Sequence, residues 1–431
     1  MSVRALDDRL APYRVGRDGP FGLDEAIHLA RRVECGATPA RMAALAAAGL
    51  EGALDEVLSD APASPAEAGL LAMGARIARR GDTDALAAAW LLRFLGERPW
   101  REHLALFWHD HFATSQDKVA DLVAMEVQNR ILLESGAGPF AALLERVAKD
   151  PAMLLWLDQA ASTPLRPNEN FARELFELFT LGRGHYAESD VLEAARALTG
   201  WSLRGGRFAW RPEAHDAGEK TILGERGAFD GDAVLAIAVA APRRRRFIAE
   251  KLCRWFVREE IDEELGSGLA ALMEEAGDVT AVFLRRLLAS RLFFSEAARG
   301  ALVRNPVQLA VGALRTLDAR VATTELARRV ADLGLALFRP PSVEGWRNGT
   351  AWLDSAGLVG RQNLGVLIAE GEDGPLRVRS RLEPETEGAA VFRAFLGRAP
   401  DEEDRRLLVA AHPDPRALVG ALMQEPEAQL H

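Results

Sequence analysis

The sequence predicts a mainly α-helical protein, built as one large irregular multi-helical domain with a small β-hairpin insert. Apolar residues recur at helical spacing along most of the chain, and Gly and Pro residues end each periodic stretch. Only residues 201–210 alternate between large apolar and other side chains, around a Gly205-Gly206 pair that is typical of a hairpin turn. These observations predict the fold class.

The predicted helices follow one another through the first half of the chain, with breaks at residues such as Gly36 and Pro39. Two of them, at 99–112 and 116–134, are expected to form a helix pair. In order, the helical segments cover residues 23–34, 38–58, 63–95, 99–112, 116–134, 139–149, 151–160, 168–181 and 188–200.

Beyond the hairpin the pattern is less regular. Residues 211–232 are rich in glycine and charge and predict an irregular loop, and the Pro/Gly/Trp-rich residues 340–352 predict another. Helices are expected at 232–240, 242–258, within 266–316, at 322–337 and at 355–370. We therefore predict a main domain over 1–370, a linker or long loop over 371–388, and a small helical C-terminal appendage over 389–431.

The composition is that of a globular protein. The 431 residues are 48% hydrophobic and 27% charged, which is enough for two or three hydrophobic cores. The net charge of −10 argues against a general nucleic-acid binder, because phosphate contacts need a basic surface. We see no apolar stretch of membrane-spanning length and no signal peptide, so we expect a cytoplasmic protein. Cys35 and Cys253 form no zinc pattern or disulfide framework.

The segment 168–182 has the most informative pattern. On a helix, its polar side chains fall on one narrow arc and its Phe and Leu side chains on the opposite side. Pro167 or Asn168 can begin this helix, and Gly182 can end it. The polar arc consists of Asn170, Arg173, Glu174 and Glu177.

Seven segments stand out in order along the chain: Phe107–Ser115, Asn168–Gly182, Ala194–Trp201, His215–Gly224, Phe247–Leu252, Arg304–Pro306, and Pro341–Trp346 followed by Trp352. Together they resemble the DUF1800 family, a bacterial family of unknown function. The similarity runs from about residue 25 to 370, and the resemblance brings no settled activity with it. Many members of that family carry export signals, whereas none is visible here.

The first candidate for chemistry is a metal site. His109 and His111 are two residues apart, so on a helix their rings point about 200° apart. We expect His111 to point inward and His109 outward, which prevents both from binding one ion. A site of His111, His215 and Glu174 would suit zinc, iron or manganese. The alternative is that His111 is a buried, hydrogen-bonded histidine.

The second candidate is the polar arc itself. Glu174 and Glu177 lie one turn apart and could act as acid and base if their surroundings separate their pKa values. Arg173 is expected to pair with Glu177 at i,i+4 spacing. Together with Lys220, Arg173 could orient an anionic substrate or intermediate. A structural ion network or a plain surface would produce the same pattern.

A third candidate is a serine nucleophile. Ser115 and Lys118 have the Ser-x-x-Lys spacing, in which a neutral amine takes the hydroxyl proton. The simpler interpretation is that Ser115 or Thr114 caps the helix that begins at Gln116. The two His-Asp dipeptides, at His109 and His215, are only a weak indication of a metal-dependent phosphohydrolase.

Tryptophans and arginines complete the candidates. Trp201, Trp210, Trp346 and Trp352 lie in the two irregular regions, where they pack the loops onto the core or form a cleft for a sugar or aromatic group. Residues 243–246 are four arginines at a helix start, and we expect them to form a solvated basic turn rather than a phosphate site. Asp230 is expected to cap the next helix.

Two functions remain open. The first is a metal-assisted hydrolase acting on a small-molecule or polymer substrate, with a pocket between residues 99–112, 168–181 and 211–224. A Ser-x-x-Lys serine hydrolase is a variant of this enzyme hypothesis. The second is a non-catalytic binding or assembly protein, whose polar residues hold the helices together and whose Trp-rich loops contact a protein partner.

Overall fold

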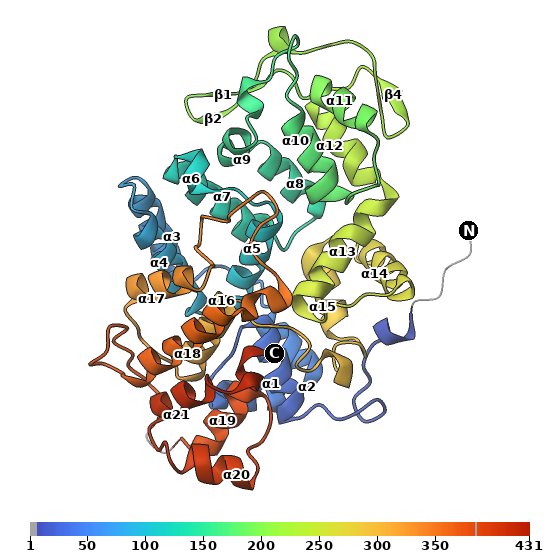
Figure 1. The fold of residues 1–431 in the computed structure, drawn as a ribbon. Coiled ribbons are helices and arrows are strands. Elements are labelled where there is room, and N and C mark those ends of the chain that lie inside the picture. The colour runs from blue at the N-terminus through green and yellow to red at the C-terminus, as the bar shows by residue number, and fades with distance from the viewer. Residues whose placement is uncertain (1–6, 384–385) are drawn as a thin grey trace.

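The structure is a computed structural model, and it describes residues 7–383 and 386–431. Within those ranges the chain is mainly helical, with 21 α-helices and two small two-stranded antiparallel sheets. The predicted fold class is confirmed. Figure 1 places the hairpins and α10–α12 at one end of the molecule, the C-terminal helices α19–α21 at the other, and α5 between them.

The helices of the first half follow the predicted order. They are α1 (Leu23–Val33), α2 (Pro39–Val57), α3 (Pro65–Ala78), α4 (Thr83–Phe94), α5 (Pro99–His111), α6 (Gln116–Val119), α7 (Leu122–Ser135), α8 (Phe140–Ala148), α9 (Pro151–Trp156), α10 (Glu169–Glu174) and α11 (Glu188–Ala197). The predicted helix 116–134 is two helices, because Ala120 adopts a left-handed conformation and Asp121 caps the second.

The second half contains α12 (Gly231–Ala240), α13 (Pro242–Phe256), α14 (Glu263–Glu275), α15 (Thr280–Leu288), α16 (Pro306–Thr316), α17 (Thr323–Asp332), α18 (Ser355–Ala369), α19 (Gly388–Leu396), α20 (Glu402–Asp404) and α21 (Pro415–Leu422). Asp230 caps α12 as predicted, since its carboxylate accepts the Ala233 N–H. None of the helices in the described part of the chain is both long and apolar enough to cross a bilayer.

Short 3₁₀ and π segments connect these helices. The 3₁₀ segments are η1 (Asp8–Leu10), η2 (Gln159–Ala161), η4 (Pro212–Ala214), η5 (Glu296–Ala298), η6 (Gly349–Leu353) and η8 (Pro426–Gln429). The π segments are η3 (Leu175–Thr180) and η7 (Arg405–Val409). The predicted helix 168–181 is therefore α-helical only to Glu174 and continues as the wider π-helix η3.

Two hairpins interrupt the helices. β1 (Trp201–Arg204) pairs with β2 (Arg207–Trp210) through Gly205 and Gly206, which both have positive φ as a type I′ turn requires. This hairpin is the predicted one. The region 211–232, predicted as irregular, contains a second hairpin of β3 (Lys220–Ile222) and β4 (Glu225–Gly227). Its strands have only three residues each, too few for an alternating pattern to be recognised.

A single connected hydrophobic core runs from Leu10 to Ala428, rather than the two or three cores that the length allows. The segment 371–388 contributes buried Leu376 and Val378 to it, and residues 384–385 of that predicted linker lie outside the described residues. The helices α19 and α21 pack on α18 and α16, and Arg393 of α19 forms an ion pair with Asp24 of α1 at 2.6 Å. The C-terminal helices therefore share the core of the remaining chain.

Candidate active site

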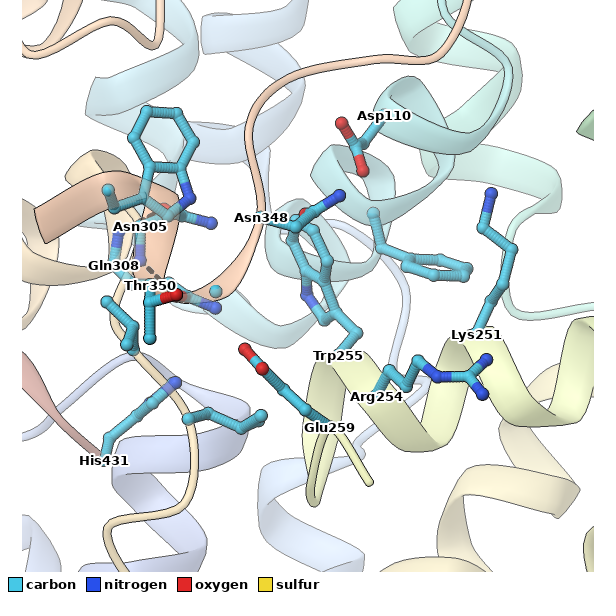
Figure 2. A pocket seen from close by; sticks show the side chains of 15 residues that line it. Asp110, Lys251, Arg254, Trp255, Glu259, Asn305, Gln308, Asn348, Thr350 and His431 are labelled. Atoms are coloured by element: carbon cyan, nitrogen blue, oxygen red, sulfur yellow. Dashed lines mark hydrogen bonds between the residues drawn. The ribbon is translucent and has the colours of Figure 1, made fainter. Parts of the chain in front are cut away.

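A cavity of about 430 Å³ lies where α5, α13 and the start of α16 meet the segment 348–352 (Figure 2). We call it the α5–α13 cavity. Phe107, Trp255 and Trp352 supply aromatic surface to it. Its polar side chains are Asp110, Lys251, Arg254, Glu259, Asn305, Gln308, Asn348, Thr350 and His431. Figure 2 shows the Asp110 carboxylate and the Lys251 amine at one end of the cavity and His431 at the other.

Asp110 is held by the loop that carries Trp346. One carboxylate oxygen, Oδ1, accepts the Trp346 N–H at 2.8 Å, and Oδ2 has no hydrogen-bond partner among the described residues. Gly345 has a φ of +90°, and a Cβ there would overlap the Asp110 carboxylate. This close approach explains the glycine of the Pro341–Trp346 motif. Burial raises the pKa of Asp110 to about 6, although the Trp346 N–H and the charge of Lys251 act in the opposite direction.

Lys251 differs from the other lysines of the chain. Only four of the 53 lysines and arginines are lysines. Lys118 and Lys149 form ion pairs, and Lys220 donates to main-chain carbonyls. Within the described residues Lys251 has no hydrogen bond and no ion pair, and its amine lies 5.5 Å from the centre of the Phe247 ring. Burial lowers the pKa of Lys251 to about 8, and the charge of Asp110 raises it in part.

His103 positions one side of the cavity. Its Nε2 accepts hydrogen bonds from Trp255 Nε1 and from the Gln308 amide, both at 2.9 Å. Its Nδ1 lies 3.2 Å from the Val33 carbonyl, so we assign the proton to Nδ1. Burial lowers the pKa of His103 to about 4, and the ring is therefore neutral. This neutral imidazole fixes the orientation of Trp255.

The start of α16 explains the Arg304–Pro306 motif. Asn305 caps the helix, because its Oδ1 accepts the Gln308 N–H at 2.9 Å, and the Gln308 Oε1 in turn accepts the Asn305 N–H at 2.8 Å. Pro306 occupies the first helical position. The amide groups of Asn305 and Gln308 thereby become fixed parts of the cavity lining.

The predicted metal ligands are not brought together. His111 is fully buried among aromatic rings, and its Nε2 lies 3.1 Å from the Phe179 carbonyl. His215 lies against Trp210, with Nδ1 3.0 Å from the Thr199 carbonyl. Across the described residues, no group of three or more His, Cys, Asp or Glu side chains could hold a metal ion. The set of His111, His215 and Glu174 therefore does not form a ligand shell here.

The polar arc of the predicted helix is tied up in ion pairs. Arg173 pairs with Glu169 at 3.0 Å and with Glu188 at 2.5 Å. Glu177 binds Arg183 at 2.6 Å and the Tyr186 hydroxyl, so the predicted Arg173–Glu177 pair is wrong. The reason is the π-helix that begins at Leu175, which changes the angular spacing of the side chains after it.

The two glutamates of this arc nevertheless have separated pKa values. Burial, followed by the charge of Glu177, raises the pKa of Glu174. The Tyr186 and Arg183 hydrogen bonds lower the pKa of Glu177. Neither glutamate lines the α5–α13 cavity. The pKa values of Glu174 and Glu177 thus move in opposite directions, as an acid–base pair requires. However, Arg183 and Tyr186, which lower the pKa of Glu177, also use its carboxylate oxygens.

The other predicted residues have structural contacts. Lys220 is buried and donates to the carbonyls of Asp216 and Gly218, which closes the loop before β3. Lys118 forms an ion pair with Asp158 at 2.7 Å, so its amine is engaged away from Ser115. Ser115 precedes α6 but makes no capping hydrogen bond through its side chain. The Ser-x-x-Lys spacing thus has no supporting geometry.

The structure corrects two predictions, for His109 and for the arginines 243–246, and it shows where two of the tryptophans lie. His109 is buried beside Trp90 and Trp346, not outward, because α5 is surrounded by other elements on all sides. The arginines 243–246 are not a solvated turn, since Arg244 is buried and binds Asp278 at 2.8 Å. Trp346 and Trp352 are buried in the core, and Trp352 also lines the cavity.

Lys251 was not identified as a site residue from the sequence, and Asp110 was considered there only as part of a weak His-Asp dipeptide. Both lie within motifs of the resemblance, Asp110 between the two histidines and Lys251 inside Phe247–Leu252. A usable signal was present, because a lysine is conspicuous in a chain that places arginine at nearly every basic position. Burial and the lack of partners could not be read from the motif.

Comparison with known proteins gives one match. The model of a family described as "Protein of unknown function (DUF1800)" matches residues 28–430. The match extends beyond residue 370, where the resemblance in the sequence ended. No curated protein and no solved structure matches the chain.

Proposed function

The chain belongs to the DUF1800 family, and we propose that it is a hydrolase whose acid–base pair is Asp110 and Lys251 in the α5–α13 cavity. The observation that carries this proposal is the pair itself. Both groups reach one cavity, and neither forms an ion pair with any described residue. Charged groups that are buried without a partner are concentrated at functional sites.

The pKa directions assign the roles. With pKa values of about 6 for Asp110 and about 8 for Lys251, the main state between these values has a carboxylate and an ammonium. Asp110 then removes a proton from a water molecule. At a carbonyl carbon the hydroxide adds and the tetrahedral intermediate expels the leaving group; at an acetal carbon the hydroxide displaces the leaving group as the C–O bond to it breaks. Lys251 gives its proton to the leaving group, and the proton taken by Asp110 returns to solvent or to Lys251.

The lining indicates the substrate class. Trp255 and Trp352 offer aromatic surface to a ring, and Asn305, Gln308 and Thr350 offer donors and acceptors to hydroxyl groups. A cavity of about 430 Å³ is the size that a small molecule fills. We therefore infer a small hydroxylated substrate rather than an extended polymer.

A metal-assisted hydrolase at His111, His215 and Glu174 remains a separate hypothesis. Bound zinc, iron or manganese would supply an activated water there, but the three side chains do not converge. A non-catalytic binding or assembly protein is the second alternative. In such a protein the polar residues hold the helices together, and the ion pairs of Arg173 and Glu177 are contacts of this kind. The cavity favours the enzyme, because a purely structural lysine would be expected to have a partner.

A panel of nitrophenyl esters and nitrophenyl glycosides tests the proposal. We expect turnover of at least one panel member by the purified protein, and a loss of about 100-fold or more in Asp110→Asn and Lys251→Met. Lys149→Met is the matched control, because Lys149 is ion-paired outside the cavity. Equal turnover in all three variants would refute the assignment, and binding of a panel compound without turnover would favour the binding protein.

A further inference from the structure

A second cavity, of about 260 Å³, lies between α1 and the C-terminal segment and is rich in arginine. We call it the arginine cavity. His28, Arg31, Arg299, Arg398, Glu427 and His431 supply its polar side chains. It is separate from the acid–base pair, since neither Asp110 nor Lys251 lines it.

Arg31 is buried without a carboxylate partner. Its Nη1 donates to the Leu396 carbonyl at 2.7 Å and its Nη2 to the Leu430 carbonyl at 2.8 Å. Its Nε has no acceptor among the described residues. The chain comes very close to this guanidinium, because a Cβ on Gly397 would overlap Arg31 Nη1. Arg31 is therefore held in place by carbonyl oxygens, which do not neutralise its charge.

Two further buried arginines lie near Arg31. Arg32 donates to the Ala298 carbonyl, and Arg304 donates to the Phe395 carbonyl at 3.1 Å. Each has an Nε and an Nη1 without an acceptor in the described part of the chain. Burial, together with the charges of Arg304 and Arg32, lowers the pKa of Arg31 well below its usual value. The three guanidiniums thus repel one another in a buried site.

The other two arginines that line the cavity, Arg299 and Arg398, use the nearby carboxylates for their own ion pairs. Arg299 pairs with Glu25 at 2.9 Å, and Arg398 pairs with Asp404 and with Glu427. Arg31, Arg32 and Arg304 therefore have no carboxylate partner among the described residues, whereas Arg299 and Arg398 are paired. Buried guanidinium groups without a carboxylate partner are strongly unfavourable unless an anion neutralises them.

We propose that the arginine cavity binds a small oxyanion of the phosphate class, held by Arg31 and Arg299. Guanidinium groups match the tetrahedral oxygens of phosphate through paired N–H donors. The volume of about 260 Å³ admits inorganic phosphate or the phosphoryl end of a small metabolite. The site does not depend on the proposed hydrolase activity.

Thermal unfolding of the full chain tests this site. The midpoint is measured in increasing sodium phosphate and in sodium chloride of equal ionic strength, because only specific binding to the folded state raises it beyond the salt effect. We expect a saturable increase with phosphate alone. An equal response to both salts would overturn the proposal. Ribose 5-phosphate, with ribose as its control, shows whether the ligand is free phosphate or a phosphorylated metabolite. A larger increase of the midpoint with ribose 5-phosphate than with phosphate identifies a metabolite, and equal increases identify the free anion.

Three variants connect the response to the cavity. Arg31→Gln should abolish the phosphate-specific increase, and Arg299→Gln should weaken phosphate binding at least tenfold by equilibrium dialysis. Arg146→Gln is the matched control, because Arg146 is exposed and pairs with Glu134 outside the cavity. If Arg31→Gln fails to fold, Arg299→Gln decides alone. Unchanged phosphate affinity in Arg299→Gln would overturn the assignment.

Discussion

The polar arc of α10 and η3 and the α5–α13 cavity treat charged side chains in opposite ways. On the arc, Arg173 and Glu177 each have two charged or hydroxyl partners, supplied by α10 itself and by residues 183–188 that follow. In the cavity, Asp110 is buried and Lys251 is half-buried, and neither forms an ion pair to any residue in the described ranges. The charges of the arc are thus satisfied by the protein itself, whereas those of Asp110 and Lys251 stay available for a substrate.

This difference has an energetic meaning. Exposed ion pairs such as Arg173–Glu188 contribute little to stability and cost little to remove. An unpaired amine in a cavity opposes folding, so its presence suggests a function that outweighs the cost. Matched substitutions in the two regions therefore test this difference.

The largest expected difference concerns turnover. If a nitrophenyl substrate is found, Asp110→Asn should lower the rate by a factor of about 10²–10⁴, the usual contribution of a general acid or base. Glu177→Gln, the matched change on the arc, should leave the rate within about twofold, because Glu177 does not line the cavity. Steady-state kinetics of both variants measures this. A larger loss in Glu177→Gln would reverse the comparison.

The next effect is the pH dependence of turnover. The rate should rise with pH through about 6, as Asp110 loses its proton and becomes the base. It should fall through about 8, as Lys251 loses the proton that it must donate. Each limb should change the rate by about tenfold per pH unit.

The Lys251 limb can be measured without a substrate. After reductive methylation with ¹³C-formaldehyde, NMR should resolve the four lysines of the chain, with Lys251 titrating near 8. In Asp110→Asn the pKa of Lys251 should decrease further, because the negative charge that favours the ammonium is removed. If all four lysines titrated above 10, and if Asp110→Asn left the pKa of Lys251 unchanged, the interaction between Asp110 and Lys251 would be contradicted.

A smaller effect concerns stability. Because the folded-state pKa of Lys251, about 8, is below its ordinary value of 10.5, the folded protein loses this proton before the unfolded chain does. The cost of the buried charge is therefore complete below pH 8 and decreases as the pH rises to 10.5. Lys251→Met should raise the free energy of unfolding at pH 7 by about 1–2 kcal/mol, an amount reduced for solvent access to the amine. Urea unfolding at pH 7 and pH 10 checks both the gain and its disappearance.

The smallest effect is expected on the arc. Arg173→Met removes partly exposed ion pairs and should lower the free energy of unfolding by less than about 1 kcal/mol. Urea unfolding in low and high salt measures it, and the difference should shrink in high salt. A loss of several kcal/mol would mean that the arc is a structural centre of the fold.

Much of the local structure was predictable from the sequence. The Gly205-Gly206 pair predicted the first hairpin, and Asp230 predicted the start of α12, because each signal acts within a few residues. The β3–β4 hairpin was missed, since its strands are too short to show a period. The π-helix η3 was also missed, because nothing in the apolar pattern of 168–181 distinguishes it from an α-helix.

The candidate site was predictable only in part. The motif around His109 and His111 does lie beside it, but the residue that reaches the cavity is Asp110. The expected ligands His111 and His215 are each bound by a nearby carbonyl instead. Side chains that look reactive in a motif are often the ones that the fold has already satisfied with hydrogen bonds.

Short-range periodicity and motif order were enough to predict the helical class, the first hairpin, the Asp230 cap and the family. Which charges are paired and which are free depends instead on how the helices pack. Asp110 and Lys251 come from helices far apart in the chain, and their pKa values depend on burial by several other elements. Burial and ion pairing are properties of packed surfaces, so no local pattern in the sequence contains them.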